Sequence, residues 1–222
     1  MKRYAVIGAS SGTGLALVHL LAGEQNAVRA ISRRPPEASP LIEPFGADVT
    51  DAQSIAKALD GEFDAVFYTV DIHGLFKRRD EIRAVMFEGC RNAIHAAEQI
   101  AVRPKFVLLS VMGVDRSSWM WWVLNMSKPG MQRNILEREQ LLKESALSYI
   151  ICRAPKLNDR SSGVVPAAAT PPQHELDMKR SISRADLARA LFLAAERAPG
   201  NTTWDVFSEA AGPAPEWLLA TT

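Results

Sequence analysis

Three glycines near the start of the chain have the spacing of a turn that binds a nicotinamide dinucleotide. Residues 4–7 form an apolar run typical of a strand, and the segment 8–14, Gly-Ala-Ser-Ser-Gly-Thr-Gly, leads directly into a helical pattern. Gly8 permits a tight turn, Gly12 lets a diphosphate approach the backbone, and Gly14 allows close helix packing. A glycine-rich connection without a ligand is the alternative. Free N–H groups at the helix start would bind the diphosphate, so we expect cofactor contacts from these residues: Gly8, Ser10, Ser11, Gly12, Thr13 and Gly14.

Basic residues at the end of the second predicted strand favour NADP(H) over NAD(H). Ser32-Arg33-Arg34 stands where an NAD-selective site usually carries an acidic residue for the ribose hydroxyls. Arg33 would pair with the 2′-phosphate and lie against the adenine, because a planar guanidinium suits both contacts. A solvated basic pair before Pro35 is the alternative.

Asp48 and Val49 follow the third predicted strand and are placed to bind the adenine. The Asp48 carboxylate would accept a hydrogen bond from the adenine amino group, and Val49 would cover the ring. A structural role for Asp48 at the approach to the next helix is the alternative.

Composition excludes several classes of protein. The chain has 222 residues, 47% hydrophobic and 23% charged, which is ordinary globular usage and fits one domain over residues 1–222. Because 26 Lys and Arg nearly balance 25 Asp and Glu, nucleic acid is an unfavourable partner. The two cysteines have no metal-ligand spacing, so no metal site is predicted. Since no signal peptide or membrane-length apolar run is visible, we expect a cytoplasmic protein that does not enter a membrane.

Short β-branched runs alternate with segments of helical period, which predicts an α/β fold of the Rossmann type, doubly wound, with a mainly parallel sheet between two layers of helices. Seven strands are expected, at residues 4–7, 27–32, 42–47, 65–70, 105–110, 149–153 and 204–208. Three helical stripes should pack on the sheet: Leu15, Val18 and Ala22; Ile82, Val85, Gly89, Ala93 and Ala97; Leu187, Ala190, Leu191 and Ala194.

Local signals place the helix starts and one loop. Thr50 with Gln53, and Ser183 with Asp186, have capping-box spacing. The prolines in residues 161–173 interrupt a run of small residues, which predicts a mobile loop without a regular element. Substrate-side loops are expected at 111–134 and 156–180.

With these residues in view, the chain resembles the extended and atypical short-chain dehydrogenases/reductases over nearly its whole length. The segments that carry the resemblance are 8–14, Asp48-Val49, Leu108-Leu109-Ser110, 141–155 and 182–188. Within that superfamily it is most similar to the compact NAD(P)H-binding proteins that include NmrA-like sensors and flavin and biliverdin-IXβ reductases. The resemblance implies a cofactor across the carboxyl ends of the strands. It also implies ribose contacts from Thr69 and Val70, nicotinamide near Pro155, and Ser110 facing the reacting carbon as the catalytic residue.

The proton donor usual in that superfamily, a Tyr followed four residues later by a Lys, is absent. The three tyrosines are followed at that spacing by Gly8, Ile72 and Arg153, and the aligned helix carries Met131 and Ile135 at the two positions. Neither side chain can donate a proton. Ser110 would therefore act as a hydrogen-bond partner of the acceptor or carboxamide; capping of the backbone is its alternative role.

Aromatic residues follow the fifth predicted strand, where the substrate should lie. Met112 precedes a segment with three of the five tryptophans, and Trp119 and Trp122 offer the flat surface that a planar acceptor needs. Burial in the core or in a homodimer contact is the alternative. His73, after the fourth strand, is a candidate proton relay or an ordinary loop histidine.

Two functions fit these observations. One is an NADPH-dependent reductase that transfers hydride to a planar conjugated acceptor, flavin- or quinone-like, without a Tyr-Lys pair. The alternative is an NAD(P)H-binding redox sensor or scaffold with reduced catalysis. A sugar-nucleotide epimerase or dehydratase is disfavoured, because the chain is short after the sixth strand and lacks the tyrosine. The expected partner is a small-molecule substrate, and the chain is expected to be a monomer or homodimer.

Overall fold

The seven apolar runs form the parallel part of one central sheet. The computed structural model describes all residues except 73, 75, 161–165, 209–211 and 220–222. An eight-stranded sheet has the order β3-β2-β1-β4-β5-β6-β10-β8, in which only β8 is antiparallel to its neighbour. The strands are β1 (Arg3–Ile7), β2 (Ala27–Ser32), β3 (Ile42–Gly46), β4 (Ala65–Tyr68), β5 (Lys105–Val111), β6 (Tyr149–Ala154), β8 (Pro166–Ala169) and β10 (Thr202–Ser208). The predicted doubly wound, mainly parallel fold is confirmed.

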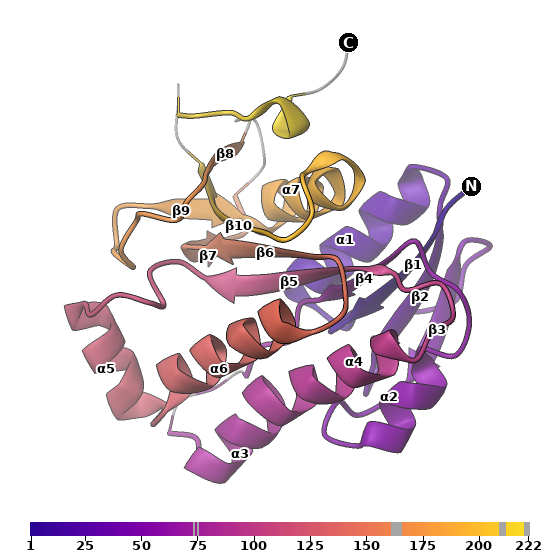
Figure 1. The fold of residues 1–222 in the computed structure, drawn as a ribbon, viewed down its shortest axis with the longest axis horizontal. Helices are drawn as coiled ribbons and strands as arrows, with labels where there is room; N and C mark the ends of the chain where they lie inside the picture. Colours follow the sequence, from indigo (N-terminus) through magenta and orange to yellow (C-terminus); the bar gives the residue numbers. More distant parts are fainter. Residues whose placement is uncertain (73, 75, 161–165, 209–211, 220–222) are drawn as a thin grey trace.

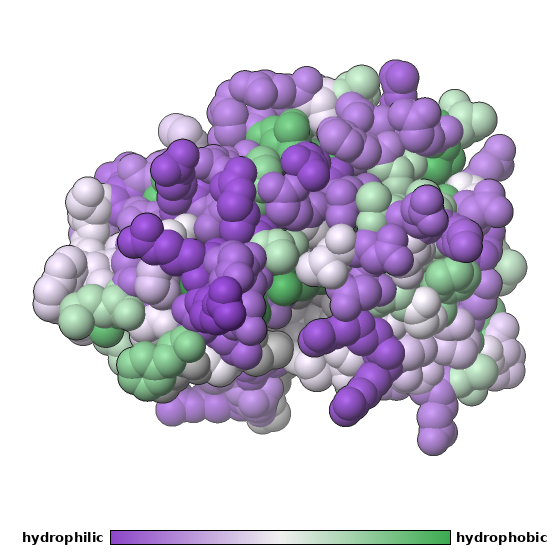
Figure 2. Space-filling model, turned by 90° about the horizontal axis from the view of Figure 1, so that it is seen from below, coloured by the Kyte–Doolittle hydropathy of each residue, from purple (hydrophilic) through white to green (hydrophobic). Residues whose placement is uncertain are grey.

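Helices cover both faces of the sheet, which gives three layers (Figure 1). The helices α1 (Gly12–Gly23) and α7 (Arg184–Arg197) pack on one face, and α2 (Ala52–Ala58), α4 (Gly89–Glu98) and α6 (Met131–Glu144) pack on the other. The helix α3 (Arg79–Arg83) runs through a π-helical turn, η1 (Ala84–Glu88), into α4. Seen from below, the layer formed by α2, α4 and α6 is largely hydrophilic on its outer side (Figure 2). No helix in the described part of the chain is long and apolar enough to span a bilayer.

Smaller elements gather at the carboxyl ends of the strands. The helix α5 (Trp119–Ser127) follows β5, and β7 (Lys156–Asn158) pairs in parallel with β9 (Ser181–Ser183) in a separate two-stranded sheet. A short 3₁₀ helix near the end of the chain, η2 (Glu216–Leu218), lies apart from this group and packs on α7 and β8. In Figure 1, α5 and the connection from β8 to β9 flank the same edge of the central sheet, at the left of the view.

The expectation of no regular element in residues 161–173 was wrong. Residues 161–165 lie outside the described part, but Pro166–Ala169 form β8, antiparallel to β10. The strand tolerates a proline because it lies at the sheet edge and Pro166 is its first residue. Its four residues are buried, and Ala168 N–H donates to the Pro213 carbonyl at 2.8 Å, outside the sheet.

Two local expectations also needed correction. The cap of α2 is Asp51 rather than Thr50: its carboxylate accepts from the N–H groups of Gln53 and Ser54. The buried face of α1 consists of Thr13, Gly14, Leu17, Val18 and Leu21, so Val18 is the only member of the expected stripe that is fully buried. The predicted cap of α7 is confirmed, because Ser183 Oγ accepts from Asp186 N–H at 3.0 Å.

Candidate functional site

The glycine turn is a tight bend between β1 and α1. Gly8 and Gly12 have φ values of 97° and 59°, which side chains rarely adopt. The N–H groups of Gly8 and Ala9 both donate to the Ile31 carbonyl of β2, at 2.9 and 3.2 Å. Ser11 is the N-cap of α1, and its side chain makes no capping hydrogen bond. The first N–H groups of this helix therefore remain available to a ligand.

Close packing fixes two of the glycines against β4. A Cβ on Gly14 would overlap the Gly8 carbonyl oxygen and lie 2.6 Å from Thr69 Oγ1, and one on Gly8 would lie 2.8 Å from the same hydroxyl. Thr69 Oγ1 donates to the Ile7 carbonyl at 2.9 Å. The Thr69 hydroxyl proton is thus used to join β4 to β1, and the two glycines are required by the fold of the turn.

The residues predicted for the adenine end lie at the carboxyl ends of β2 and β3. Asp48 Oδ1 accepts from Thr50 N–H at 2.9 Å and from Thr50 Oγ1 at 2.8 Å. These bonds, with the nearby charge of exposed Arg33, hold the pKa of Asp48 below its usual value although partial burial opposes the shift. Val49 packs on α4, where a Cβ on Gly89 would lie 2.8 Å from Val49 Cγ2.

A buried polar network lies at the carboxyl end of β5. Ser110 is 2% exposed, and its hydroxyl donates to Glu139 Oε1 of α6 at 2.5 Å. Glu139 also accepts from Arg153 Nε at 3.1 Å and Nη2 at 2.7 Å, and Arg153 Nη1 donates to Asp115 at 2.7 Å. Burial alone would lower the pKa of Arg153, but the two carboxylates raise it. The arginine therefore stays charged, and it neutralises a carboxylate held in the interior.

The network belongs to a row of polar residues across three strands. Ser110 pairs in register with Arg153, and Arg153 pairs with Asp205 of β10. Asp205 is fully buried, and its Oδ2 accepts from the N–H groups of Gln173 and His174 and contacts His174 Nδ1 at 3.0 Å. The sequence reasoning did not single out Glu139 or Asp205 as polar partners. For Asp205 the available signal was a charged residue inside an otherwise apolar strand, whereas Glu139 lies on α6 and had no such signal.

Comparison with known proteins identifies the family. Residues 8–197 match the family model described as NAD(P)H-binding. The chain belongs to this family. A 3 beta-hydroxysteroid dehydrogenase/Delta 5-->4-isomerase of Mycobacterium tuberculosis is 33% identical over 119 residues, which is 50% of this chain but only 32% of that protein. The chain therefore aligns with about a third of this curated relative.

Solved structures of similar fold cover nearly the whole chain. An anaerobilin reductase from Escherichia coli O157:H7 matches with a TM-score of 0.71 at 22% identity, over 96% of this chain and 100% of the other. The oxidoreductase ylbE from Lactococcus lactis gives 0.76 at 17% identity, over 96% and 93%. A short-chain dehydrogenase/reductase from Veillonella parvula in complex with NADP gives 0.72 at 15% identity, over 97% and 99%. These similarities confirm the Rossmann-type fold.

Features of the turn fit the dinucleotide that the NAD(P)H-binding family takes. Thr13 Oγ1 and Ser32 Oγ are buried and find no hydrogen-bond partner among the residues that the structure describes. Unsatisfied hydroxyls are uncommon in protein interiors, and a polar ligand would satisfy them. Thr13 belongs to the glycine turn at the start of α1, and Ser32 ends β2 next to Ile31, whose carbonyl accepts from Gly8 and Ala9 of the turn. The residues present can therefore hold a phosphate-bearing ligand at this place.

Among the residues predicted to bind the substrate, the two tryptophans are exposed and Met112 is buried. Trp119 and Trp122 are each 66% exposed on α5, whereas Trp121 is buried and donates from Nε1 to the Gly113 carbonyl at 2.9 Å. The Met112 side chain is fully buried beside Ala167, Ala169 and Phe207, so it presents no open surface to a substrate. His73 lies outside the described residues. Val70 is half-buried, and Pro155 is buried between β6 and β7.

Proposed function

We propose that this NAD(P)H-binding protein is an NADPH-dependent reductase of planar conjugated acceptors, flavin- or quinone-like. The observation that carries the proposal is that two apolar side chains occupy the positions of α6 where a proton donor would be needed. Met131 and Ile135, which align with the usual Tyr and Lys, are buried in an apolar cluster with Trp121, Met86 and Val114. No group at these two positions can give a proton to a carbonyl oxygen. A conjugated acceptor avoids that need, because it can take a hydride first and a solvent proton afterwards.

Each part of the site has a role in this reaction. The glycine turn with Ser10, Ser11 and Thr13 binds the diphosphate, and Arg33 binds the 2′-phosphate. Asp48 and Val49 bind the adenine. Thr69 and Val70 contact the ribose. Bound NADPH supplies the hydride and is oxidised to NADP⁺. Pro155 and Ser110 border the nicotinamide, and Trp119 and Trp122 hold the flat acceptor and exclude water from it.

Ser110 acts as an acceptor of hydrogen bonds rather than as an acid. Its only proton is donated to Glu139, so the lone pairs of Oγ remain for the carboxamide N–H or a substrate donor. In this role Ser110 orients the nicotinamide.

Turnover tests the reaction. We expect loss of NADPH absorbance when the protein is mixed with flavins, quinones or anaerobilin, the last suggested by the anaerobilin reductase of similar fold. A flat trace over the panel would contradict the reductase. The sensor alternative is supported by the same absence of an acid, and calorimetry separates the two: a sensor binds one redox form of the cofactor much more tightly and does not turn over.

Arg33 tests the cofactor preference. Hydrogen bonds to charged groups contribute ~1.5–3 kcal/mol, so Arg33→Ala should raise the Kd for NADPH ~10–100-fold and raise that for NADH, which lacks the 2′-phosphate, much less. The neighbouring Arg34→Ala is the matched control, and it should alter neither. Equal effects of Arg33→Ala on both cofactors would contradict the NADP preference.

A further inference from the structure

A cationic side chain from the far end of the sequence covers the glycine turn. A Cβ built on Gly12 would lie 3.5 Å from Arg184 Nε and 3.7 Å from Arg184 Cδ. Gly8 and Gly14 pack against Thr69, but at Gly12 the atoms found within 4 Å of that position, among the described residues beyond its chain neighbours and its own helix backbone, belong to Arg184. The arginine side chain therefore lies against Gly12, on the side where a Cβ would otherwise stand.

Regular elements determine where Arg184 lies. The strands β7 and β9 end on the register pair Asn158 and Ser183, and the next residue of each, Asp159 and Arg184, form an ion pair at 2.6 Å. Arg184 is the first residue of α7, which Ser183 caps. Because α7 packs along α1, whose first residue is Gly12, the two helix starts are held side by side.

The ion pair with Asp159 is easily exchanged. The Asp159 side chain is 81% exposed and that of Arg184 is 32% exposed. Exposed ion pairs contribute little to stability, because water solvates the separated charges well. A diphosphate offers several charged oxygens at the same place, and a guanidinium can bind two of them at once.

We propose that Arg184 is a diphosphate-binding residue of the cofactor site, which leaves Asp159 and binds the phosphate oxygens when the dinucleotide enters. The proposal rests on the proposed cofactor site. It adds to that site a residue that lies outside the glycine motif, about 170 positions further along the chain. The helix α7 thereby takes part in cofactor binding, and Asp159 competes with the ligand for the arginine.

Fragments of the cofactor test the contact. For Arg184→Gln we expect the Kd for NADPH, measured by fluorescence titration, to rise ~10-fold, since one charged hydrogen bond is lost. The Kd of 2′-phospho-ADP-ribose, which contains the diphosphate and is measured by displacement of bound NADPH, should rise equally. That of adenosine 2′-monophosphate, which lacks it, should stay unchanged and also shows that the site is folded. The exposed Arg189 of the same helix gives the control Arg189→Gln, which should change none of the three.

Asp159, which competes with the diphosphate for Arg184, allows a second test. Asp159→Asn should lower the Kd for NADPH ~2–5-fold, the range that loss of an exposed ion pair allows, and should have no effect in the Arg184→Gln background. Unchanged or tighter NADPH binding by Arg184→Gln would overturn the diphosphate contact, and no decrease with Asp159→Asn would overturn the exchange. If the wild-type protein bound neither NADPH nor 2′-phospho-ADP-ribose, the proposed function would fail as well.

Discussion

Ser110 and Glu139 are joined by a buried hydrogen bond of 2.5 Å, and this bond connects the end of β5 to the middle of α6. Glu139 is also the partner of Arg153, through both of its carboxylate oxygens. A charged pair in the interior is costly to break, because the group left behind has lost its water. The serine is therefore held in one orientation by a network whose integrity can be measured as stability.

Glu139→Gln should destabilise the protein strongly. The amide keeps the shape of the side chain but removes the charge opposite Arg153, and one-sided removal of a buried pair costs ~3–5 kcal/mol. Asp115 remains as a partner of Arg153, so we expect the low end, a loss of ~3 kcal/mol. Urea denaturation measures the free energy of unfolding.

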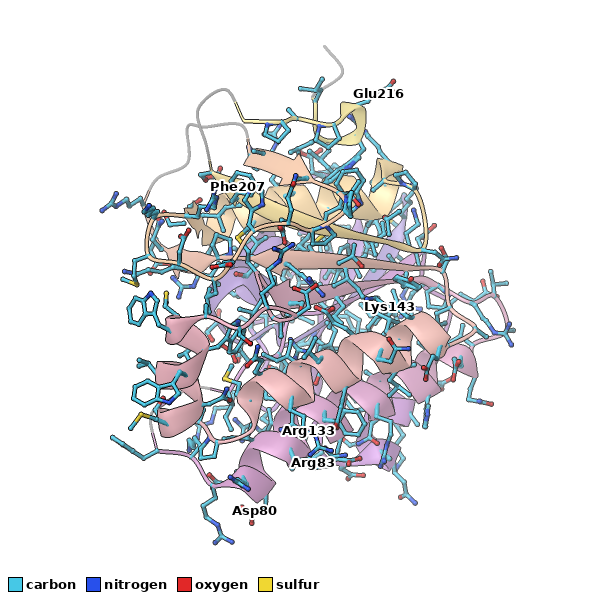
Figure 3. All side chains as sticks on the ribbon, turned by 60° about the vertical axis from the view of Figure 1, so that its left-hand side comes forward. Asp80, Arg83, Arg133, Lys143, Phe207 and Glu216 are labelled. Atoms are coloured by element: carbon cyan, nitrogen blue, oxygen red, sulfur yellow. The ribbon has the colours of Figure 1, made fainter. Side chains whose placement is uncertain are left out.

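Glu137, on the solvent side of the same helix, is the control. It forms ion pairs with Arg83 at 2.7 Å and Arg133 at 2.6 Å, the two arginines labelled one above the other in Figure 3. Both partners are well exposed, so Glu137→Gln should cost ~1 kcal/mol or less. If the two variants lost similar amounts of unfolding free energy, the buried network would not stabilise the protein more than an exposed ion pair does.

Gly14→Ala should impair both folding and cofactor binding. The added Cβ would overlap the Gly8 carbonyl oxygen and lie 2.6 Å from Thr69 Oγ1, and overpacking of this kind typically costs ~1–3 kcal/mol. The start of α1 must shift, so the Kd for NADPH should rise. Gly23→Ala at the other end of α1 meets nothing within 4 Å and should leave the Kd unchanged and stability equal or up to ~1 kcal/mol higher. Normal binding by Gly14→Ala would contradict a diphosphate site in this turn.

Patterns of neighbouring residues were sufficient to predict the main sheet. All seven predicted strands exist with ends shifted by at most two residues. A parallel strand buried on both faces has a continuous apolar sequence, which accounts for the central strands but not for the edge strand β3, where only Ile42 is buried. The edge strand β8 lacked that signal, since an alanine run after a proline has low strand propensity and is held by β10. Before α2, the Thr50 hydroxyl donates a hydrogen bond to Asp48, and the carboxylate of Asp51 caps the helix instead.

The partners within the site could not be predicted in this way. Ser110 and Glu139 are 29 positions apart, and Gly12 and Arg184 lie near opposite ends of the chain. No local spacing relates such residues, because only the register of the sheet and the packing of α7 on α1 bring them together. The glycine turn was recognisable because all of its parts lie within seven consecutive residues.

Acid should destabilise the protein partly through Asp48. Hydrogen bonds from Thr50 and the charge of Arg33 hold the pKa of Asp48 below 3.8, its value without these contacts. The unfolded chain then binds more protons, so the stabilisation is complete above the unfolded pKa and is lost as the pH falls through the folded one. Urea denaturation in steps from about pH 6 to about pH 3 should show a decrease in the free energy of unfolding that is shallower below about pH 4 for Asp48→Asn. Parallel curves for variant and wild type would contradict this role.

The tryptophans of α5 should separate substrate binding from folding. Trp119 and Trp122 are exposed, so replacing both with alanine should change the free energy of unfolding by only ~0.5 kcal/mol or less per substitution. If they stack on the acceptor, the KM for it should rise ~10-fold while the Kd for NADPH stays the same. Steady-state kinetics with NADPH saturating measures the first, and titration measures the second.

Trp121 is the matched control, because it lies on the same helix but is 1% exposed and donates to the Gly113 carbonyl. Trp121→Ala should cost ~3–5 kcal/mol by leaving a cavity and an unpaired carbonyl oxygen. A KM unchanged in the Trp119→Ala, Trp122→Ala variant would remove these side chains from the acceptor site. Sedimentation of wild type and variant would then test the remaining explanation of an exposed aromatic pair, since a homodimer joined through α5 must dissociate when both rings are lost.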